Sequence, residues 1–277
     1  MKRRGVLTWG MAALFFCAAV CLAESGDLSA EDIVRKANHM SLYQGDDCRG
    51  RVTLTITDKQ GRVRKREFNM LRKDADASDT DQKYFVFFHE PADIRKMVFI
   101  VHKQVFSGKD DDRWLYMPNL DLVKRIAASD KGTSFVGSDF LYEDISGRSP
   151  SEDIHELVET TESHHVLKSR PIKPEAVEFA YYVSLIDKKT FLPSDITYFR
   201  SDDRPYRRIR SIRVESVEAD EKGVRVDYPT VTLSFAEDLD TGGRTEMAFS
   251  RVRYNTGLTE DLFSERYLRR PPKDVVR

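Results

Sequence analysis

The sequence predicts a mainly β protein, built as one antiparallel meander with a helix near each end. Apolar and polar residues alternate with a period of two in many segments, as at Val52, Leu54 and Ile56. Short turn-forming stretches, such as residues 58–61 and 240–243, separate these segments. Turns this short join antiparallel neighbours, because parallel strands need long crossover connections.

The first half begins with a helix and continues as strands. We expect a helix over residues 30–41, because Ser29 and Asp32 form a capping pattern and Ile33, Ala37 and Met40 follow at helical spacing. The period then changes to two, which favours strands. These strands are expected at residues 52–57, 62–72, 84–88, 97–101, 114–117 and 122–126.

The second half repeats the strand pattern. Strands are expected at residues 155–168, 176–187, 192–200, 206–218, 224–238 and 244–254. Residues 135–148 are less regular and predict a loop or a helical turn. Residues 258–268 predict a short helix, and Pro271-Pro272 begins a loose basic tail. About eleven strands in one meander predict a strongly curved sheet, which either closes into a barrel or leaves a mouth that helices cover.

Composition excludes several classes of protein. The 277 residues carry a net charge of −1, with 33% charged and 40% hydrophobic residues. This mixture is neither that of a disordered tail nor that of a polytopic membrane protein. A dedicated nucleic-acid binder normally has a basic excess, so we expect no nucleic-acid partner.

The N-terminus predicts a secretory signal peptide over residues 1–23. Lys2, Arg3 and Arg4 precede an uncharged apolar run, and Cys21 and Ala23 place small residues before a cleavage site. An uncleaved membrane anchor is the alternative, whereas lipidation is not expected because Phe16 and Val20 stand before the two cysteines. Cleavage would leave residues 24–277 as a single domain with a net charge of −4. Only Cys48 would remain, so no internal disulfide is expected.

Catalytic and metal-binding patterns are missing from the sequence. The six histidines show no metal-ligand spacing, and Asp110, Asp111 and Asp112 are interpreted as a solvated turn rather than a cation site. The stretch Gly137-Ser138-Asp139 is not a nucleophile elbow, and neither a phosphate loop nor a dinucleotide fingerprint occurs. We therefore expect neither an enzyme nor a cofactor.

Five arginines form the strongest basic cluster: Arg204, Arg207, Arg208, Arg210 and Arg213. One interpretation is the solvated face of an exterior strand. The other is a patch that docks an acidic partner or anionic lipid headgroups.

Aromatic residues suggest a binding cavity. Residues 84–88 and 97–101 are apolar on both faces, and two-sided apolarity needs two apolar environments. One environment would be the core under a helix, and the other a cavity for an apolar ligand; ordinary burial against covering helices is the alternative. The candidate cavity residues are Phe85, Phe87, Met97, Phe99, Trp114 and Tyr116.

Several stretches resemble a known family. Residues 112–118, 124–126, 133–140 and 142–144 occur in a succession that resembles the longer relatives of outer-membrane lipoprotein-sorting proteins, the LolA-like group. The segments 182–187 and 190–193 resemble the central hairpin of that group, and the tail over residues 254–268 is also similar.

The resemblance implies a fold and a function. The fold would be a half-open, incurved antiparallel β-barrel with helices that cover its mouth. The function would be that of a monomeric periplasmic carrier for the acyl chains of a lipid or lipoprotein. The longer relatives are associated with RND-type transporters, so an accessory protein docked on an inner-membrane transporter is the alternative, and a hydrolase that uses Ser138 a further one. The motif residues are candidates for partner contact or for fixing a turn through Asp144: Arg125, Phe135, Gly137, Ser138, Asp139 and Asp144.

Overall fold

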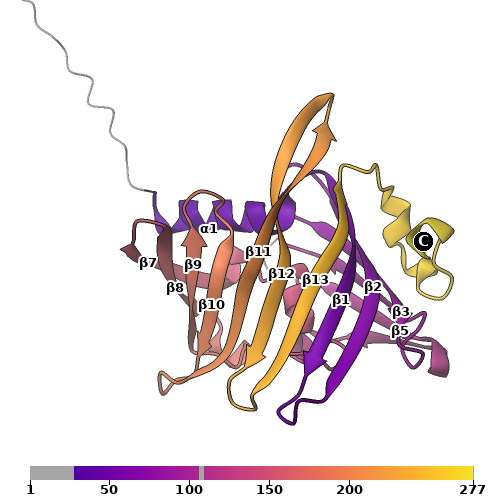
Figure 1. Ribbon diagram of the computed structural model, residues 1–277, viewed down its shortest axis with the longest axis horizontal. Helices are drawn as coiled ribbons and strands as arrows, with labels where there is room; N and C mark the ends of the chain where they lie inside the picture. The colour runs from indigo at the N-terminus through magenta and orange to yellow at the C-terminus, as the bar shows by residue number, and fades with distance from the viewer. Residues whose placement is uncertain (1–27, 106–108, 277) are drawn as a thin grey trace, which may run out of the picture.

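Thirteen antiparallel strands form one curved sheet in the computed structural model, which describes residues 28–105 and 109–276 (Figure 1). The first six are β1 (Asp47–Thr57), β2 (Val63–Asp74), β3 (Gln82–Glu90), β4 (Val98–Lys103), β5 (Asp112–Met117) and β6 (Leu122–Ile126). The others are β7 (Asp153–Thr160), β8 (His164–Pro171), β9 (Tyr181–Asp187), β10 (Pro193–Phe199), β11 (Pro205–Glu221), β12 (Val224–Asp238) and β13 (Gly243–Tyr254). The sheet is the half-open, incurved β-barrel that the sequence analysis expected.

The order of the strands explains why the barrel is half open. Strands that are neighbours in sequence pair, except β6 and β7, and the first and last strands also pair. The order is therefore β6-β5-β4-β3-β2-β1-β13-β12-β11-β10-β9-β8-β7. The free edges are therefore β6 and β7, which are consecutive in the chain. Residues 127–152, here called the connector, join these two edges. The connector contains the short helix α2 (Tyr142–Ser146).

A short helical segment covers the concave side of the sheet. The helix α1 (Ala30–Asn38) continues into one π-helical stretch, η1 (His39–Tyr43). The hydroxyl of Ser29 accepts a hydrogen bond from the backbone N–H of Asp32, as the capping pattern predicts. The buried face of α1 presents Ile33 and Ala37 to Leu167 and other residues of the sheet. Within the described ranges, no helix is both long and apolar enough to cross a membrane.

Strands β12 and β13 separate from each other toward one end of the sheet, at the top of Figure 1. The β12–β13 ladder runs only between the pairs Asp238–Gly243 and Leu233–Ala248. Beyond it, β12 continues to pair with β11, while β13 continues to pair with β1 as far as Tyr254. A bulge in β13, where Arg251 has a positive φ of 54°, turns that strand. The β11–β12 hairpin therefore projects away from the sheet (Figure 1).

Two expected elements are corrected. Residues 155–168 are not one strand, because residues 161–163 form a turn between β7 and β8 in which the N–H of Thr161 donates to the carbonyl of His164. This turn contains neither glycine nor proline, so nothing in the sequence indicated that one strand ends there and another begins. Residues 258–268 form two short 3-10 turns, η6 (Glu260–Phe263) and η7 (Glu265–Tyr267), rather than a helix. Their buried residues Leu258, Phe263 and Leu268 are spaced by five, which does not fit one face of an α-helix.

Further differences are small. The structure divides the expected eleven or so strands into thirteen, and the basic tail contains one helical turn, α3 (Lys273–Val276). The expected signal peptide lies outside the described residues. Division of the chain into 1–23 and 24–277 therefore stays a prediction.

Two hydrophobic clusters occupy the two faces of β2–β5. The concave cluster includes Phe68, Phe88 and Phe99, and the convex cluster includes Phe85 and Ile100. The connector covers the first, and the C-terminal segment over residues 258–276 covers the second. The two-sided apolarity of residues 84–88 and 97–101 thus reflects burial on both faces against the protein's own segments.

The five arginines of the basic cluster pair with acidic side chains. Arg208 pairs with Asp195, and Arg210 binds Glu237 through Nε at 3.0 Å. The other pairs are Arg204 with Asp240, Arg207 with Asp144 and Arg213 with Glu215. Neighbouring acids thus offset this positive charge, which removes the main support for a free basic patch.

Candidate functional site

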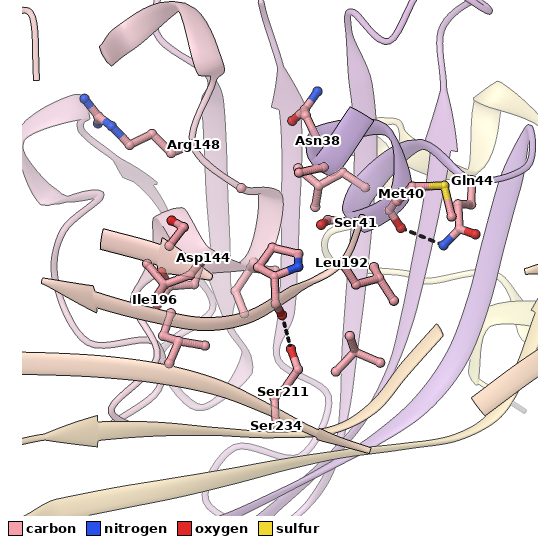
Figure 2. Close-up of a pocket in the computed structure, with 18 of the residues that line it drawn as sticks. Asn38, Met40, Ser41, Gln44, Asp144, Arg148, Leu192, Ile196, Ser211 and Ser234 are labelled. Atoms are coloured by element: carbon pink, nitrogen blue, oxygen red, sulfur yellow. Dashed lines mark hydrogen bonds between the residues drawn. The ribbon is translucent and has the colours of Figure 1, made fainter. Parts of the chain in front are cut away.

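The candidate site is a cavity of about 440 Å³ on the concave side of the sheet. The α1–η1 segment, strands β8–β13 and the connector all contribute to its wall. Figure 2 shows Leu192, Ile196 and Ser234 on the sheet side, with Asn38 and Met40 opposite. The volume lies in the range that small-molecule sites commonly have, about 300–1,000 Å³.

Small side chains explain why this part of the sheet is hollow. Gly50, Ser184, Ser211 and Ser234 line the cavity at inward-facing positions. Cross-strand pairing places Ser211 beside Ser234, and Ser234 beside Met247. Ser211 also donates to the carbonyl of Pro193 at 2.7 Å, which satisfies its hydroxyl (Figure 2). Small residues leave a space between the sheet and α1 that larger side chains would fill.

Most of the cavity wall is apolar. Aliphatic and methionine side chains from separate strands face the space, including Met70, Leu167, Ile186, Leu192, Ile196, Ile209 and Met247. Burial of apolar ligand surface against such a wall is favourable by about 25 cal/mol per Å². The wall is therefore suited to a hydrocarbon ligand.

An aromatic plug closes the neighbouring part of the concave face. We define the plug as Phe135, Phe140, Tyr142 and Ile145 of the connector. The ring of Phe135 lies 5.6 Å from Phe99 and 5.9 Å from Phe88, measured between centroids. Phe140 and Ile145 also line the cavity, so the plug forms one of its walls.

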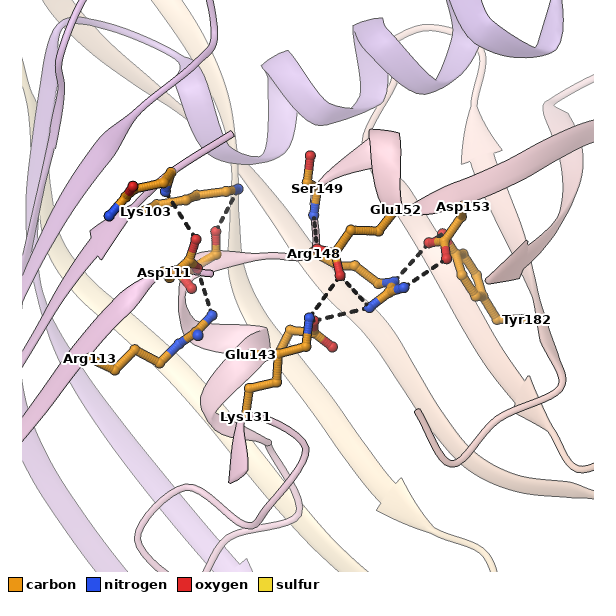
Figure 3. Close-up of polar contacts among 12 residues, drawn as sticks. Lys103, Asp111, Arg113, Lys131, Glu143, Arg148, Ser149, Glu152, Asp153 and Tyr182 are labelled. Atoms are coloured by element: carbon orange, nitrogen blue, oxygen red, sulfur yellow. Dashed lines mark hydrogen bonds and ion pairs between the residues drawn. The ribbon is translucent and has the colours of Figure 1, made fainter. Parts of the chain in front are cut away.

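A network of charged side chains fixes the connector beside the cavity (Figure 3). Arg148 donates through Nε and Nη2 to the two carboxylate oxygens of Asp153, at 2.8 and 2.9 Å. Lys131 lies 2.8 Å from Glu143 and 2.7 Å from Glu152. Burial alone would raise the pKa of Glu152, but the charges of Lys131 and Arg148 lower it. The network thus favours the ionised form of Glu152 and holds the connector in place.

The predicted cavity residues do not line this cavity, and they lie on two faces of the sheet. Met97 and Phe99 belong to the concave cluster, beneath the plug. Phe85, Phe87, Trp114 and Tyr116 belong to the convex cluster under the C-terminal segment. The physical reason is register: Val86, not Phe85, lies opposite Phe99, and Ile100 lies opposite Trp114. Their assignment to one cavity wall is therefore corrected.

Most motif residues hold the connector in position. Phe135 is fully buried in the plug, and Gly137 takes a φ of +79° at the turn. The hydroxyl of Ser138 donates to the carbonyls of Phe135 and Phe140. Asp139 accepts a hydrogen bond from Thr245 on β13. These contacts tie the turn to the sheet.

The remaining two motif residues differ in burial. Asp144 accepts from the backbone N–H of Leu141 at 2.6 Å and pairs with Arg207, and burial raises the pKa of its carboxyl group. Arg125 on β6 is exposed and pairs with Asp112. No group of three or more His, Cys, Asp or Glu side chains that could hold a metal occurs in the part of the chain that the structure describes.

The signal that sequence reasoning missed was small residue size. The cavity was expected where aromatic residues are dense, but the protein's own side chains fill that region. Gly50, Ser184 and Ser234 could have been recognised as inward-facing small residues only with the strand register known.

Fold and cavity together define a class of protein: a half-open β-barrel with a hollow, largely apolar interior beneath a short helix. The comparisons with known proteins agree with this fold. A family model described as "uncharacterized protein" matches residues 80–270, and because this is more than half of the chain, the chain belongs to that family. No curated protein matches the chain.

Solved structures confirm the LolA-like fold. A DUF1329 family protein from Desulfovibrio piger is 25% identical with a TM-score of 0.75, covering 87% of this chain and 100% of its own. An outer membrane lipoprotein-sorting protein domain from Vibrio parahaemolyticus is 22% identical with a TM-score of 0.75, covering 87% and 98%. A LolA superfamily protein from Nitrosomonas europaea is 17% identical with a TM-score of 0.63, covering 87% and 100%.

Proposed function

We propose that this protein is a periplasmic carrier that binds an acyl chain of a lipid or lipoprotein in the cavity beneath α1, and moves it between sites of the cell envelope without catalysis. The observation that carries the proposal is the hollow, apolar cavity in a LolA-like fold. The predicted signal peptide supports the periplasmic location.

The size of the cavity supports one chain as its occupant. At about 440 Å³, it has roughly three times the volume of a ~150 Å³ cavity that binds benzene. Each buried methylene contributes about 0.8 kcal/mol, so a chain of about 16 carbons gains at most about 13 kcal/mol before ordering costs are subtracted. Such a gain suffices to keep the acyl chain bound to the protein in aqueous surroundings. After the ordering costs are subtracted, the remaining affinity still allows the chain to be released.

Native mass spectrometry tests the proposal. Protein produced with its own N-terminal segment and purified from periplasm should carry copurified lipid. The Ser234→Phe variant should carry much less, because its ring occupies the cavity beside Met247. The matched control is Ser250→Phe, which places the same ring at an exposed position on β13. Both variants should keep the circular dichroism of a β protein.

Two results would contradict the carrier. The first is lipid-free wild-type protein that also fails to take up a fluorescent fatty acid; if it copurified with an inner-membrane transporter, the accessory role would be favoured instead. The second is equal lipid occupancy in folded Ser234→Phe and Ser250→Phe proteins, because the lipid would then lie outside this cavity.

A further inference from the structure

One end of the cavity differs from the rest, because two buried polar side chains meet there. Gln44 follows η1, and Arg72 lies near the end of β2. Both line the cavity, and they are only 4% and 7% exposed. They are also in contact, since Nη2 of Arg72 donates to the backbone carbonyl of Gln44 at 2.6 Å.

The side chain of Gln44 presents an unsatisfied acceptor. Its Nε2 donates to the carbonyl of Met40 at 2.6 Å and to that of Pro229 at 2.8 Å (Figure 2). Only the amide nitrogen can serve two carbonyls, so the orientation of the amide is fixed. Its Oε1 is buried and has no hydrogen-bond partner in the structure. An unmatched buried acceptor is costly, and a ligand that donates to it relieves that cost.

Arg72 presents an unsatisfied donor. Its Nη atoms donate to the carbonyls of Leu42, Gln44 and Gly45, and Nη1 lies 3.6 Å from Asp74. Its Nε–H is buried and has no partner in the structure. Two side chains that line this end of the largely apolar cavity thus contain one buried free acceptor and one buried free donor.

We propose that Gln44 and Arg72 form a subsite for the secondary amide of an amide-linked acyl chain; this rests on the proposed binding of acyl chains. The amide oxygen accepts from Nε of Arg72, and the amide N–H donates to Oε1 of Gln44. An ester offers an acceptor but no donor, so it leaves Gln44 unsatisfied. The hydrocarbon extends from this end along the apolar wall.

The subsite adjoins the separation between β12 and β13. Gln44 binds the carbonyl of Pro229 on β12, and the cavity is lined there by Thr230 on one side and by Val252 and Tyr254 on the other. Tyr254 and Thr230 bridge the two strands through their hydroxyls, 2.9 Å apart. To leave the cavity between these strands, the group on the nitrogen side of the amide displaces the contact between Tyr254 and Thr230.

A comparison of three ligands tests the subsite. N-butylpalmitamide, its N-methylated tertiary amide and butyl palmitate carry the same acyl chain, but only the first has an amide N–H. Each would compete with a fluorescent fatty acid for the wild-type protein. The secondary amide should bind about tenfold more tightly than the other two, the effect of one well-placed hydrogen bond in a buried site. In Gln44→Met the preference should disappear, whereas in Gln60→Met, which makes the same exchange at an exposed turn, it should persist.

The outcomes separate this inference from the proposed function. Equal binding of all three ligands to the wild-type protein overturns the amide subsite and leaves acyl binding intact. Failure of all three to compete, together with failure of the fatty acid to bind, overturns the carrier itself. The ligand series in the wild-type protein decides the question even where Gln44→Met does not fold.

Discussion

Two halves of one concave sheet face are built in opposite ways. Beneath the connector, Phe68, Phe88 and Phe99 meet the aromatic plug, and the space is filled by the protein's own rings. Beneath α1, Ser184 and Ser234 leave about 440 Å³ open. Curvature alone therefore does not make a binding site. The size of the inward side chains and the segment that covers them decide whether a half-open barrel is solid or hollow.

The largest effect should come from emptying the solid half. Phe135→Ala removes a fully buried ring at the centre of the plug and should lower the free energy of unfolding by about 3–5 kcal/mol. Urea denaturation measures this change. A loss below about 1 kcal/mol would mean that the plug is loosely packed and that the contrast between the halves is smaller than the structure indicates.

The boundary of the plug should respond to pH. Lys103 on β4 is buried and donates to the carbonyl of Ser146, and burial lowers its pKa to about 8. Between this value and the ordinary one near 10.5, the unfolded chain binds more protons than the folded one, so stability rises with pH. From pH 7.5 to 9.5, the free energy of unfolding should gain about 2 kcal/mol from this group.

Comparison with Lys103→Met isolates that contribution, because the variant retains every other titrating group. Urea denaturation of both proteins across the same pH range gives the difference directly. Parallel pH profiles would show that Lys103 keeps its proton in the folded protein.

A smaller loss is expected from trimming the hollow half. Ile196 is half-buried and already faces open space, so Ile196→Ala forfeits contacts on one side only. The free energy of unfolding should fall by about 1 kcal/mol, less than the 2–5 kcal/mol typical of a filled core. Thermal or urea denaturation checks this value. A cost equal to that of Phe135→Ala would indicate that the cavity collapses in solution.

The smallest change in stability should follow from a larger side chain in the hollow half. Ser184→Val enlarges a side chain that faces the cavity, so the free energy of unfolding should change by less than about 0.5 kcal/mol. In the solid half, Val86→Phe adds volume where none is free and should cost about 1–3 kcal/mol. Equal costs in the two variants would remove the distinction between the halves.

Local patterns predicted much of the fold. The alternation at Val52, Leu54 and Ile56 marks a true strand, and the cap at Ser29 begins a true helix. Turns with strong signals, such as residues 58–61 and 240–243, also join the expected strands. The turn at residues 161–163 was not predicted, because it contains neither glycine nor proline. Pairing of β1 with β13 joins distant parts of the chain and has no local mark.

The site could not be predicted from alternation alone. Alternation shows which residues of one strand share a face, but not which face of the next strand lies on the same side of the sheet. Phe85 and Phe87 share a face, as do Met97 and Phe99, because residues two apart on a strand point to the same side. The register of β3 against β4 places the two pairs on opposite faces. That register follows from turn geometry and from the segments that cover each face.

The separation of β12 from β13 has a consequence for how water reaches the backbone. In residues 224–232 of β12, before Leu233, the backbone amides that point toward β13 have no ladder partner. The amides that point toward β11 are paired. Deuterium should therefore enter this strand on two timescales, fast and slow at alternate residues, without any unfolding of the sheet. An amphiphile lodged between the two strands would slow the fast set, which makes its arrival visible in the exchange pattern of a single strand.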